Sequence, residues 1–518
     1  MSDVDVLIIG AGPTGLVLAL WLSHFGVRVR IIDKTAEPGT TSRALAVQAR
    51  TLELYRQLQL TDAVIDAGHK VAAANLWVRG KRAARLPLAD LGAGLSPFPF
   101  ALMFPQDAHE RLLIGRLADA GVHVERRATL AGFEQNDTGV MATIARADGS
   151  RETISASYIA GCDGAHSTVR DALRIGFPGS TYEGVFYVAD VDASGPAADG
   201  ELHVELDEAD FLAVFPLKGE GRLRLIGPIH LAAGDAEPTF EDVDRRASDT
   251  LHLRVDRANW FSTYHVHHRV ADRFRSGRAF LLGDAAHIHS PVGGQGMNTG
   301  IGDAINLAWK LAAVVHGDAR AALLDTYEPE RIGFARRLVE TTDRAFTIVT
   351  KPGRLARWVR TRVVPRVAPL LTRFRSGEHF LFLTVSQLQI SYRGSALSAG
   401  RAGRVFGGDR LPWVSLAGGS DDGNFAPLAS PEWQVHVYGF ASARLAAVCR
   451  ELRLPLHVFP WRAEMRRAGI TRDALYLMRP DSYVALVDAR ARPGELRSFF
   501  QRLHDLAFRG SDPPYATR

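Results

Sequence analysis

Gly10-Ala11-Gly12-Pro13-Thr14-Gly15 follows directly on an apolar run over residues 4–9, and this stretch decides the fold. An apolar, helix-like segment follows over 16–25, and a second strand-like segment over 28–32 ends in Asp33. Glycines at this spacing allow a tight turn and a close approach of the backbone to a pyrophosphate. The stretch therefore predicts a dinucleotide-binding βαβ unit, with Gly10, Gly12 and Gly15 at the pyrophosphate and Asp33 on the adenosine ribose.

A second glycine-rich stretch lies near the middle of the chain. A strand-like segment over 279–282 leads into Gly283-Asp284-Ala285-Ala286-His287, and Pro291-Val292-Gly293-Gly294-Gln295-Gly296-Met297-Asn298 then opens an apolar helix. N–H groups at a helix N-terminus favour electron-rich groups, and glycine lets a ligand approach the backbone. We expect Asp284, as a buried acid, to accept hydrogen bonds from the ribityl hydroxyls of a flavin. The amides from Gly294 to Asn298 would face its pyrimidine end, which makes Gly293, Gly296, Met297 and Asn298 candidate cofactor residues. A plain helix cap would need only one glycine.

A third motif, Cys162-Asp163-Gly164-Ala165-His166-Ser167-Thr168-Val169-Arg170, follows a strand-like segment over 158–160. With the three motifs in this order, the chain resembles the class A flavoprotein aromatic monooxygenases, the family of para-hydroxybenzoate hydroxylase, phenol hydroxylase and the aromatic polyketide hydroxylases. The resemblance covers residues 3–345 closely and the remainder more loosely. It implies that Asp163 and Gly164 take part in binding FAD and the reduced nicotinamide. For Arg170, a solvated charge on a helix is the alternative interpretation.

Two shorter matches extend the resemblance. Ser42-Arg43-Ala44, followed by Arg50-Thr51-Leu52-Glu53, is similar to the family's loop and helix beside the pyrophosphate, which implies that Arg43 pairs with phosphate oxygens or shields the flavin. Gln106 matches a glutamine that touches the ribityl chain in this family. An isolated arginine or glutamine can also be an ordinary surface residue.

The resemblance and the hydrophobic patterning together predict an α/β fold with three domains. Strand-like alternation fills two stretches between the motifs, 75–103 and 181–268; residues 211–215 and 222–226 of the second stretch are examples. We expect the substrate to bind between this inserted sheet and the flavin. The predicted domains are a discontinuous Rossmann-like FAD-binding domain (1–74, 104–180 and 269–390), an inserted β-sheet substrate domain (75–103 and 181–268) and a C-terminal thioredoxin-like domain (400–518).

The C-terminal part alternates strand candidates (433–438, 456–459, 483–487) with helix candidates (442–451, 494–507). Arg479-Pro480-Asp481-Ser482-Tyr483-Val484 is similar to the last hairpin of the family's thioredoxin-like domain, although Ser482 stands where glycine is usual. The chain contains no CxxC, which excludes dithiol redox chemistry. A structural or oligomerising role is therefore the preferred interpretation.

An arginine-rich stretch over 354–375 invites a membrane-surface interpretation. Pro365 and Pro369 are expected to interrupt any long helix there. We therefore favour a solvated or partner-facing basic helix.

Composition is that of a globular enzyme: 518 residues, 46% hydrophobic and 23% charged, with a net charge of only +5. No basic face with aromatic platforms indicates nucleic-acid binding, and no run approaches the length of a membrane span. The two cysteines, Cys162 and Cys449, make a disulfide framework improbable and fit a cytoplasmic protein. The N-terminal apolar segment lacks the basic start of a signal peptide. The oligomeric state is not readable, which leaves a homodimer open.

The resemblance also implies a mechanism. NADPH or NADH would reduce FAD, the reduced flavin would react with molecular oxygen to give a C4a-hydroperoxide, and one oxygen would pass to an electron-rich aromatic carbon. Pro291 and Gly294 would form a wall at the flavin's reactive edge. No general base is identifiable, because phenol hydroxylases carry an acid where this chain has Leu45. That departure favours an already acidic substrate, such as a polycyclic hydroxyquinone of polyketide type.

Histidines at 265, 267 and 268 suggest a metal site. Alternation along a strand, however, puts only His265 and His267 on one face, and no third ligand is apparent beside them, so no metal is predicted. His267 is the candidate for the substrate pocket.

Several alternatives stay open. The same scaffold could catalyse a Baeyer–Villiger or other flavin-dependent oxidation, or hold a flavin without turnover. The Asp284 loop disfavours a purely NAD-dependent dehydrogenase, and the absence of a WxWxIP signature disfavours halogenation.

Overall fold

A computed structural model describes residues 2–39, 44–206, 211–229, 239–241, 250–290, 293–350, 353–371, 373–416 and 422–507. Arg43 and Pro291 lie outside these ranges, so their predicted roles stay predictions.

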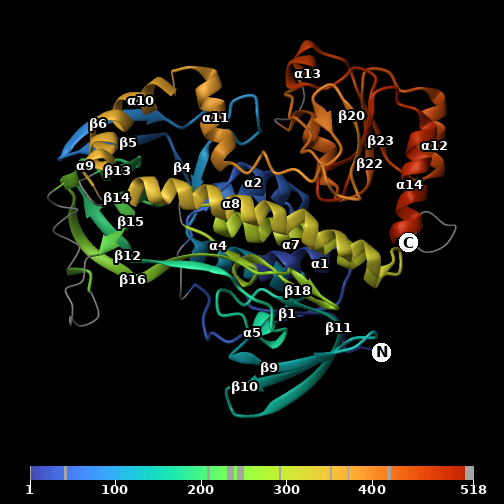
Figure 1. Ribbon diagram of the computed structural model, residues 1–518, viewed down its shortest axis with the longest axis horizontal. Coiled ribbons are helices and arrows are strands. Elements are labelled where there is room, and N and C mark those ends of the chain that lie inside the picture. The colour runs from blue at the N-terminus through green and yellow to red at the C-terminus, as the bar shows by residue number, and fades with distance from the viewer. Residues whose placement is uncertain are drawn as a thin grey trace.

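The first sheet contains the predicted βαβ unit (Figure 1). β1 (Val4–Ile9) pairs in parallel with β2 (Val29–Asp33) on one side and with β11 (Arg151–Gly161) on the other, and β11 pairs in parallel with β18 (Ala279–Leu281). The inner strands are buried apolar runs, as expected for parallel strands covered on both faces. The strand order is β17-β18-β11-β1-β2-β8, so all three cofactor motifs follow the ends of neighbouring strands. The remaining strands are β8 (Val124–Arg126), β9 (Ala128–Gln135), β10 (Val140–Arg146) and β17 (Arg275–Ser276).

Two long helices pack on this sheet and against each other. α1 (Pro13–His24) begins with a proline in its first turn, where no N–H is needed, and is buried over most of its length. α7 (Gly296–Val315) lies beside it, and both belong to the largest hydrophobic core. The other helical elements of this part are α2 (Ala49–Tyr55), η1 (Arg56–Leu58), α3 (Thr61–Ala67), α4 (Gln106–Asp119), α5 (Thr168–Ala172), η2 (Gly283–Ala285), η3 (Ala321–Thr326) and α8 (Tyr327–Thr350).

The second sheet has the order β19-β16-β12-β15-β14-β13-β5-β6. Its long strands β12 (Gly179–Ser194) and β16 (Arg254–Val270) are antiparallel and lead out of and back to the first sheet. The other members are β5 (Ala73–Val78), β6 (Lys81–Pro87), β13 (Leu202–Leu206), β14 (Phe211–Pro216), β15 (Arg222–Ile229) and β19 (His287–Ile288). A small sheet of β3 (Ala46–Val47), β7 (Ala101–Met103) and β4 (His69–Val71) forms a third element.

The C-terminal part forms a mixed sheet of its own, ordered β21-β20-β25-β24-β22-β23. β22 (Gln434–Tyr438), α12 (Ala443–Glu451) and β23 (Leu456–Phe459) form a parallel βαβ unit, and β24 (Leu475–Met478) and β25 (Val484–Asp488) follow as an antiparallel pair. The parallel βαβ unit followed by an antiparallel pair is compatible with the predicted thioredoxin-like domain, which stays a prediction. Ser482 lies in the left-handed region at φ 61°, which explains why glycine is usual there. The remaining elements are β20 (Ala399–Ala402), β21 (Val405–Phe406), η5 (Gly423–Ala429), α13 (Ala463–Ala468) and α14 (Pro493–Ala507).

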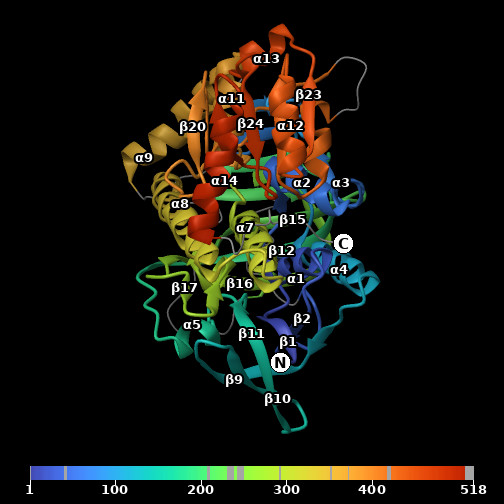
Figure 2. The same cartoon turned by 90° about the vertical axis from the view of Figure 1, so that its right-hand side faces the viewer.

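Figure 2 shows this C-terminal unit at one end of the molecule and the β9–β10 hairpin at the other.

The arginine-rich stretch is helical despite its prolines. α9 (Arg354–Trp358), a π-helical turn (Val359–Val363) and α10 (Val364–Leu371) follow one another directly, and α11 (Arg375–Val385) comes next. No long α-helix is described over residues 354–371: the π-helical turn comes directly before α10, whose first turn contains Pro365, where a missing N–H costs little. Pro369, in contrast, is accommodated inside α10. Within the described ranges no helix is both long enough and apolar enough to span a bilayer.

Candidate functional site

The glycines after β1 have two distinct tasks. A Cβ at Gly15 would collide with the carbonyl oxygen of Gly10, and a Cβ at Gly10 would collide with the backbone of Cys162. These two glycines therefore allow β1, β11 and α1 to approach closely. A Cβ at Gly12 would instead meet no atom within 4 Å. Gly12 precedes α1, whose first turn has neither a capping side chain nor an acid among the described residues, so this N-terminus is open to an anionic ligand.

Asp33 lies at the end of β2, beside that turn. Its carboxylate accepts hydrogen bonds from the N–H of Ala11 at 2.7 Å and from Thr35 Oγ1 at 2.6 Å, which fix its orientation. Arg126 lies 3.7 Å from Asp33, and its buried Nη2 has no hydrogen-bond partner among the described residues. An acceptor on a ribose or phosphate would satisfy this orphaned donor. No sequence motif contains Arg126, because only the parallel pairing of β8 with β2 brings it here.

Asp163 lies just before α5, whose N-cap is Ser167. Its carboxylate accepts hydrogen bonds from Ser167 Oγ at 2.5 Å and from the N–H of Val169 at 3.2 Å, and burial raises its pKa. Gly164 follows at φ 80°, with open space where a Cβ would stand, so the backbone is accessible to a ligand here.

Arg170 connects this motif with the Gly283-Asp284 turn. Its guanidinium is buried and donates to the carbonyl oxygens of Ala285 at 3.1 Å and Ala165 at 2.9 Å. The interpretation of Arg170 as a solvated charge is therefore wrong.

The Gly283-Asp284 turn is supported by a different acid from the one expected. Asp284 is exposed, whereas Asp303 on α7 is buried. Asp303 accepts hydrogen bonds from the N–H of Gly283 at 3.0 Å and from Arg331 Nε at 2.6 Å, and its Oδ2 lies 2.7 Å from His287 Nε2. Burial alone would raise the pKa of Asp303, but Arg331 and His287 hold it below its ordinary value. The expectation of a buried acid in this turn is corrected: Asp303 supports the turn from behind, and Asp284 faces outward.

The side chain of Asn298 connects the α7 loop to the segment that follows Arg43. Its Oδ1 accepts hydrogen bonds from the N–H of Gln48 at 2.9 Å and from Thr51 Oγ1 at 2.8 Å, and its Nδ2 donates to the carbonyl oxygens of Ala46 and Gly294, both at 2.9 Å. The buried amide thus joins the loop to β3 and α2. α7 itself begins without a capping side chain in the described part of the chain, so its first N–H groups stay available.

Gln48 strengthens the same junction, because its Nε2 donates to the carbonyl oxygen of Gly293 at 2.9 Å. Gly293 and Gly294 have φ values of 78° and 59°, which glycine adopts at low cost. Gly296 and Met297 form the first turn of α7, and Met297 packs against the main core. The described part of the loop, from Gly293 onward, is therefore fixed by hydrogen bonds to Gln48 and Asn298.

Gln106 lies beside the residue that follows Arg43. Its Oε1 accepts a hydrogen bond from the N–H of Ala44 at 3.2 Å, and its Nε2 donates to Glu110 at 2.8 Å. Burial raises the pKa of Glu110, which also accepts the N–H of Gly39. The predicted contact of Gln106 with a ribityl chain stays a prediction.

The second sheet reaches the same segment through a buried arginine. Arg224 forms a bidentate pair with Asp190 at 2.6 and 2.8 Å and donates through Nη1 to the carbonyl oxygen of Ala44 at 3.1 Å. Leu45 is buried in an apolar cluster with Val71, Met103 and Leu217, where a carboxylate would be unfavourable.

The structure separates His267 from this side of the sheet. Trp260 pairs with Asp190 in the row that carries Arg224. The register shift opposite His265 and His267 has its extra residues in β12, between Thr181 and Val185, so β16 itself continues its alternation to His267. Because side chains alternate along a strand, His267 lies on the opposite face, where its Nδ1 is 2.7 Å from Thr181 Oγ1.

Comparison with known proteins gives a consistent result. A family model described as "FAD binding domain" matches residues 3–342. The chain is 34% identical, over 536 aligned residues, to 6-methylpretetramide 4-monooxygenase of Streptomyces rimosus, covering 96% of this chain and 93% of that protein.

Solved structures of similar proteins share the whole fold. Aklavinone-11 hydroxylase, in a ternary complex with FAD and aklavinone, superposes with a TM-score of 0.79 at 26% identity, covering 98% of this chain and 99% of that one. OxyS anhydrotetracycline hydroxylase from Streptomyces rimosus superposes with a TM-score of 0.75 at 28% identity, covering 96% and 98%.

Proposed function

The chain belongs to the FAD-binding family of flavin-dependent aromatic monooxygenases, and from this premise we propose that it hydroxylates a phenolic or polycyclic, polyketide-like aromatic at the expense of NADPH or NADH. One observation supports the placement of the cofactor above all. The open turn at Gly12, the exposed Asp284 and the uncapped start of α7 follow the ends of neighbouring elements that buried contacts hold rigidly.

The residues present fit FAD. Gly12 and the start of α1 would hold the pyrophosphate, and Asp33 with Arg126 would hold the adenosine ribose. Asp163, Asp284 and Gln106 would surround the ribityl chain. The backbone from Gly294 to Asn298 would face the pyrimidine edge, with Gly293, Gly296 and Met297 shaping the loop.

Bound FAD supplies the redox chemistry, which we propose to run through the C4a-hydroperoxide of related enzymes with molecular oxygen as co-substrate. The chain's own task is to bind, orient and exclude water. Arg224 closes the second sheet onto Ala44, and the apolar cluster around Leu45 keeps that boundary dry. We place the substrate between these two elements.

The substrate class follows from two observations. Leu45 supplies no carboxylate where phenol hydroxylases have one, so a substrate that is acidic by itself suits the site. Relatives act on polycyclic polyketides by name, as 6-methylpretetramide 4-monooxygenase and aklavinone-11 hydroxylase show. The three predicted domains, a homodimer and a cytoplasmic location stay predictions beside this proposal.

The experiment is a panel of phenols, anthraquinones and other polycyclic aromatics tested for substrate-stimulated NAD(P)H consumption. We expect a product that gains one oxygen atom, taken from isotopically labelled dioxygen rather than from water. A product without the label, or consumption that yields only hydrogen peroxide across the panel, would contradict hydroxylation. Insertion of labelled oxygen next to a carbonyl with ring expansion would instead identify the Baeyer–Villiger alternative.

A further inference from the structure

The turn between β24 and β25, residues 479–483, reaches out of the C-terminal unit into the FAD-binding part. Gln57 Nε2 donates to the carbonyl oxygen of Pro480 at 2.8 Å, and Arg50 Nη2 donates to that of Asp481 at 3.2 Å. On the other side, Trp309 Nε1 donates to Asp481 Oδ2 at 3.2 Å. The turn therefore contacts both α2 with η1 and α7.

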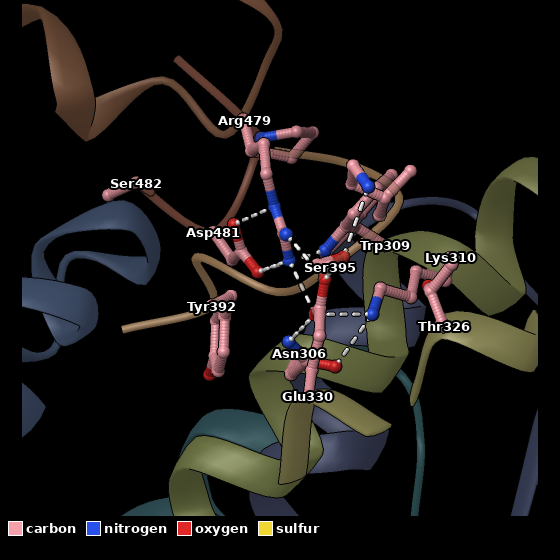
Figure 3. Close-up of polar contacts among 12 residues, drawn as sticks. Asn306, Trp309, Lys310, Thr326, Glu330, Tyr392, Ser395, Arg479, Asp481 and Ser482 are labelled. Atoms are coloured by element: carbon pink, nitrogen blue, oxygen red, sulfur yellow. Dashed lines mark hydrogen bonds and ion pairs between the residues drawn. The ribbon is translucent and has the colours of Figure 1, made fainter. Parts of the chain in front are cut away.

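A buried carboxylate at the start of α8 collects the contacts of this turn (Figure 3). Glu330 accepts two hydrogen bonds from Arg479, at 2.7 and 2.9 Å, one from Lys310 Nζ at 2.7 Å and one from Asn306 Nδ2 at 2.7 Å. Ser395 Oγ adds a fifth at 2.5 Å. Three segments far apart in the sequence thus meet at one carboxylate.

The charges in this cluster balance. Arg479 also forms a bidentate pair with Asp481, so two cations face two carboxylates. Glu330 is held in its ionised form, because Arg479 and Lys310 keep its pKa well below the ordinary value although burial would raise it. The side chains of Lys310, Glu330 and Arg479 are completely excluded from solvent. Any change of docking geometry would leave a buried charge unpaired, so the cluster enforces a single arrangement.

Asn306, Trp309 and Lys310, which make these contacts, lie on α7. The same helix begins at the flavin seat, our name for residues 294–298, where we place the flavin ring. Lys310 lies about 18 Å along the axis from Asn298, a distance that a continuous helix transmits with little bending.

A second set of contacts repeats the link: Arg331 donates to the carbonyl oxygen of Thr299 at 3.0 Å and to Tyr392 Oη at 2.9 Å. The ring centroid of Tyr392 in turn lies 4.3 Å from that of Tyr483 in the turn 479–483. Trp309 also belongs to the hydrophobic core of the C-terminal unit.

α2 is held in the same way. The Glu53 carboxylate forms ion pairs with Arg50 at 3.1 Å and with Arg410 of the C-terminal unit at 2.5 Å. Thr51, which follows Arg50 in the same turn of α2, donates to Asn298 at the flavin seat. Both helices that border the seat are therefore attached to the C-terminal unit.

We propose that the C-terminal unit is a positioning element for the flavin: its turn at 479–483, fixed through Glu330, sets the spacing of α2 and α7 and so the place of the α7 N-terminus. This inference rests on the proposed placement of FAD. It gives a task to a thioredoxin-like unit that has no CxxC.

Arg479→Met is the direct test, with Arg497→Gln as the matched control, because Arg497 pairs with Glu451 on the exposed surface of the same unit. We expect the Kd for FAD to rise at least about tenfold in Arg479→Met. The midpoint potential of the bound flavin should fall and its visible spectrum should shift, because a displaced α7 stabilises the reduced form less. The control should match the wild type in all three readouts.

The double variant Arg479→Met/Asp481→Asn separates positioning from folding. It leaves Lys310 and Glu330 as a balanced pair, so the melting temperature of the apoprotein should recover while the potential and spectrum stay shifted. If Arg479→Met does not fold, the double variant and Trp309→Phe decide by the same readouts.

A lower melting temperature with unchanged FAD affinity, potential and spectrum in these variants would overturn the inference. A wild-type protein that takes up no FAD would instead overturn the proposed function.

Discussion

Two alanine substitutions in one glycine motif should affect different properties: Gly12→Ala should weaken FAD binding, whereas Gly15→Ala should destabilise the fold. Gly12 has φ −75° and ψ −179°, an extended conformation that any residue adopts, and its Cβ would point into open space. Alanine is less favourable than glycine at an N-cap, which costs about 1 kcal/mol. Alanine also lowers the conformational entropy of the unfolded chain, which stabilises the folded state by about 0.4–1 kcal/mol. The stability of Gly12→Ala apoprotein should therefore stay within about 1 kcal/mol of wild type.

Gly15→Ala should damage the fold instead. Its Cβ would collide with the carbonyl oxygen of Gly10, a backbone atom between β1 and α1 that cannot move away as a side chain could. Overpacking of this kind costs about 1–3 kcal/mol or more. The apoprotein of this variant should melt clearly below wild type.

FAD binding separates the two roles. A methyl group at position 12 stands where we place the pyrophosphate and should remove one or two charge-assisted hydrogen bonds of about 1.5–3 kcal/mol each. Because about 1.4 kcal/mol is a factor of ten, the Kd for FAD should rise about tenfold to a hundredfold or more in Gly12→Ala.

The assay combines thermal melting of the apoprotein with FAD titration. Gly115→Ala is the matched control, since Gly115 is exposed on α4 with open space around its Cβ and is not among the residues placed at the cofactor. That variant should be slightly more stable and bind FAD normally. Wild-type FAD affinity in Gly12→Ala would refute the assignment of this turn to the pyrophosphate.

Three further predictions concern the hydrogen bonds of Asn298, the second sheet and acid stability. Asn298→Ala removes four hydrogen bonds and leaves buried backbone groups unpaired, so the free energy of unfolding should fall by about 2–4 kcal/mol and FAD should bind more weakly. An unchanged free energy by denaturant titration and an unchanged FAD affinity by fluorescence would count against this role of Asn298. Arg224→Met frees Ala44 from the second sheet and should raise the share of NAD(P)H electrons lost as hydrogen peroxide, whereas the exposed Arg257→Met control should not; equal peroxide yields would argue against the proposed closure. Burial lowers the pKa of His109 to about 3 and that of His436 to about 3. In the unfolded chain these histidines take up protons at a higher pH than in the folded protein. Their contribution to the free energy of unfolding should therefore be fully present above about pH 6.5 and fall by about 1.4 kcal/mol per pH unit per histidine as the pH drops toward the folded pKa. His436→Gln should flatten the fall in urea midpoint between pH 7 and 5, and an unaltered slope would contradict this account.

The local motifs were predictable because each carries its own physical signal. The strand, glycine turn and helix from Val4 to His24 depend on neighbours in sequence, and the strands and helices of the C-terminal unit likewise follow from short-range patterning. Ser482 was flagged as a departure from glycine, and its left-handed backbone shows that the position does demand unusual geometry.

The supports of the site were not predictable, because they join residues far apart in sequence. Asn298 was chosen for its backbone, yet its side chain holds Gln48 and Thr51, which no local pattern connects to it. Asp284 was expected to be the buried acid, whereas only the packing of α7 against α8 shows that Asp303 has that role. Arg224 lies in the alternating stretch 222–226, but its partner Asp190 becomes evident only with the register of β12 and β15.

The most direct measurement of the central claim is a crystal structure of the protein reconstituted with FAD. The account predicts the pyrophosphate at Gly12 and the start of α1, and the carbonyl edge of the flavin ring within hydrogen-bonding distance of the backbone from Gly294 to Asn298. A ring bound elsewhere, or one whose carbonyl edge points away from the first turn of α7, would contradict it.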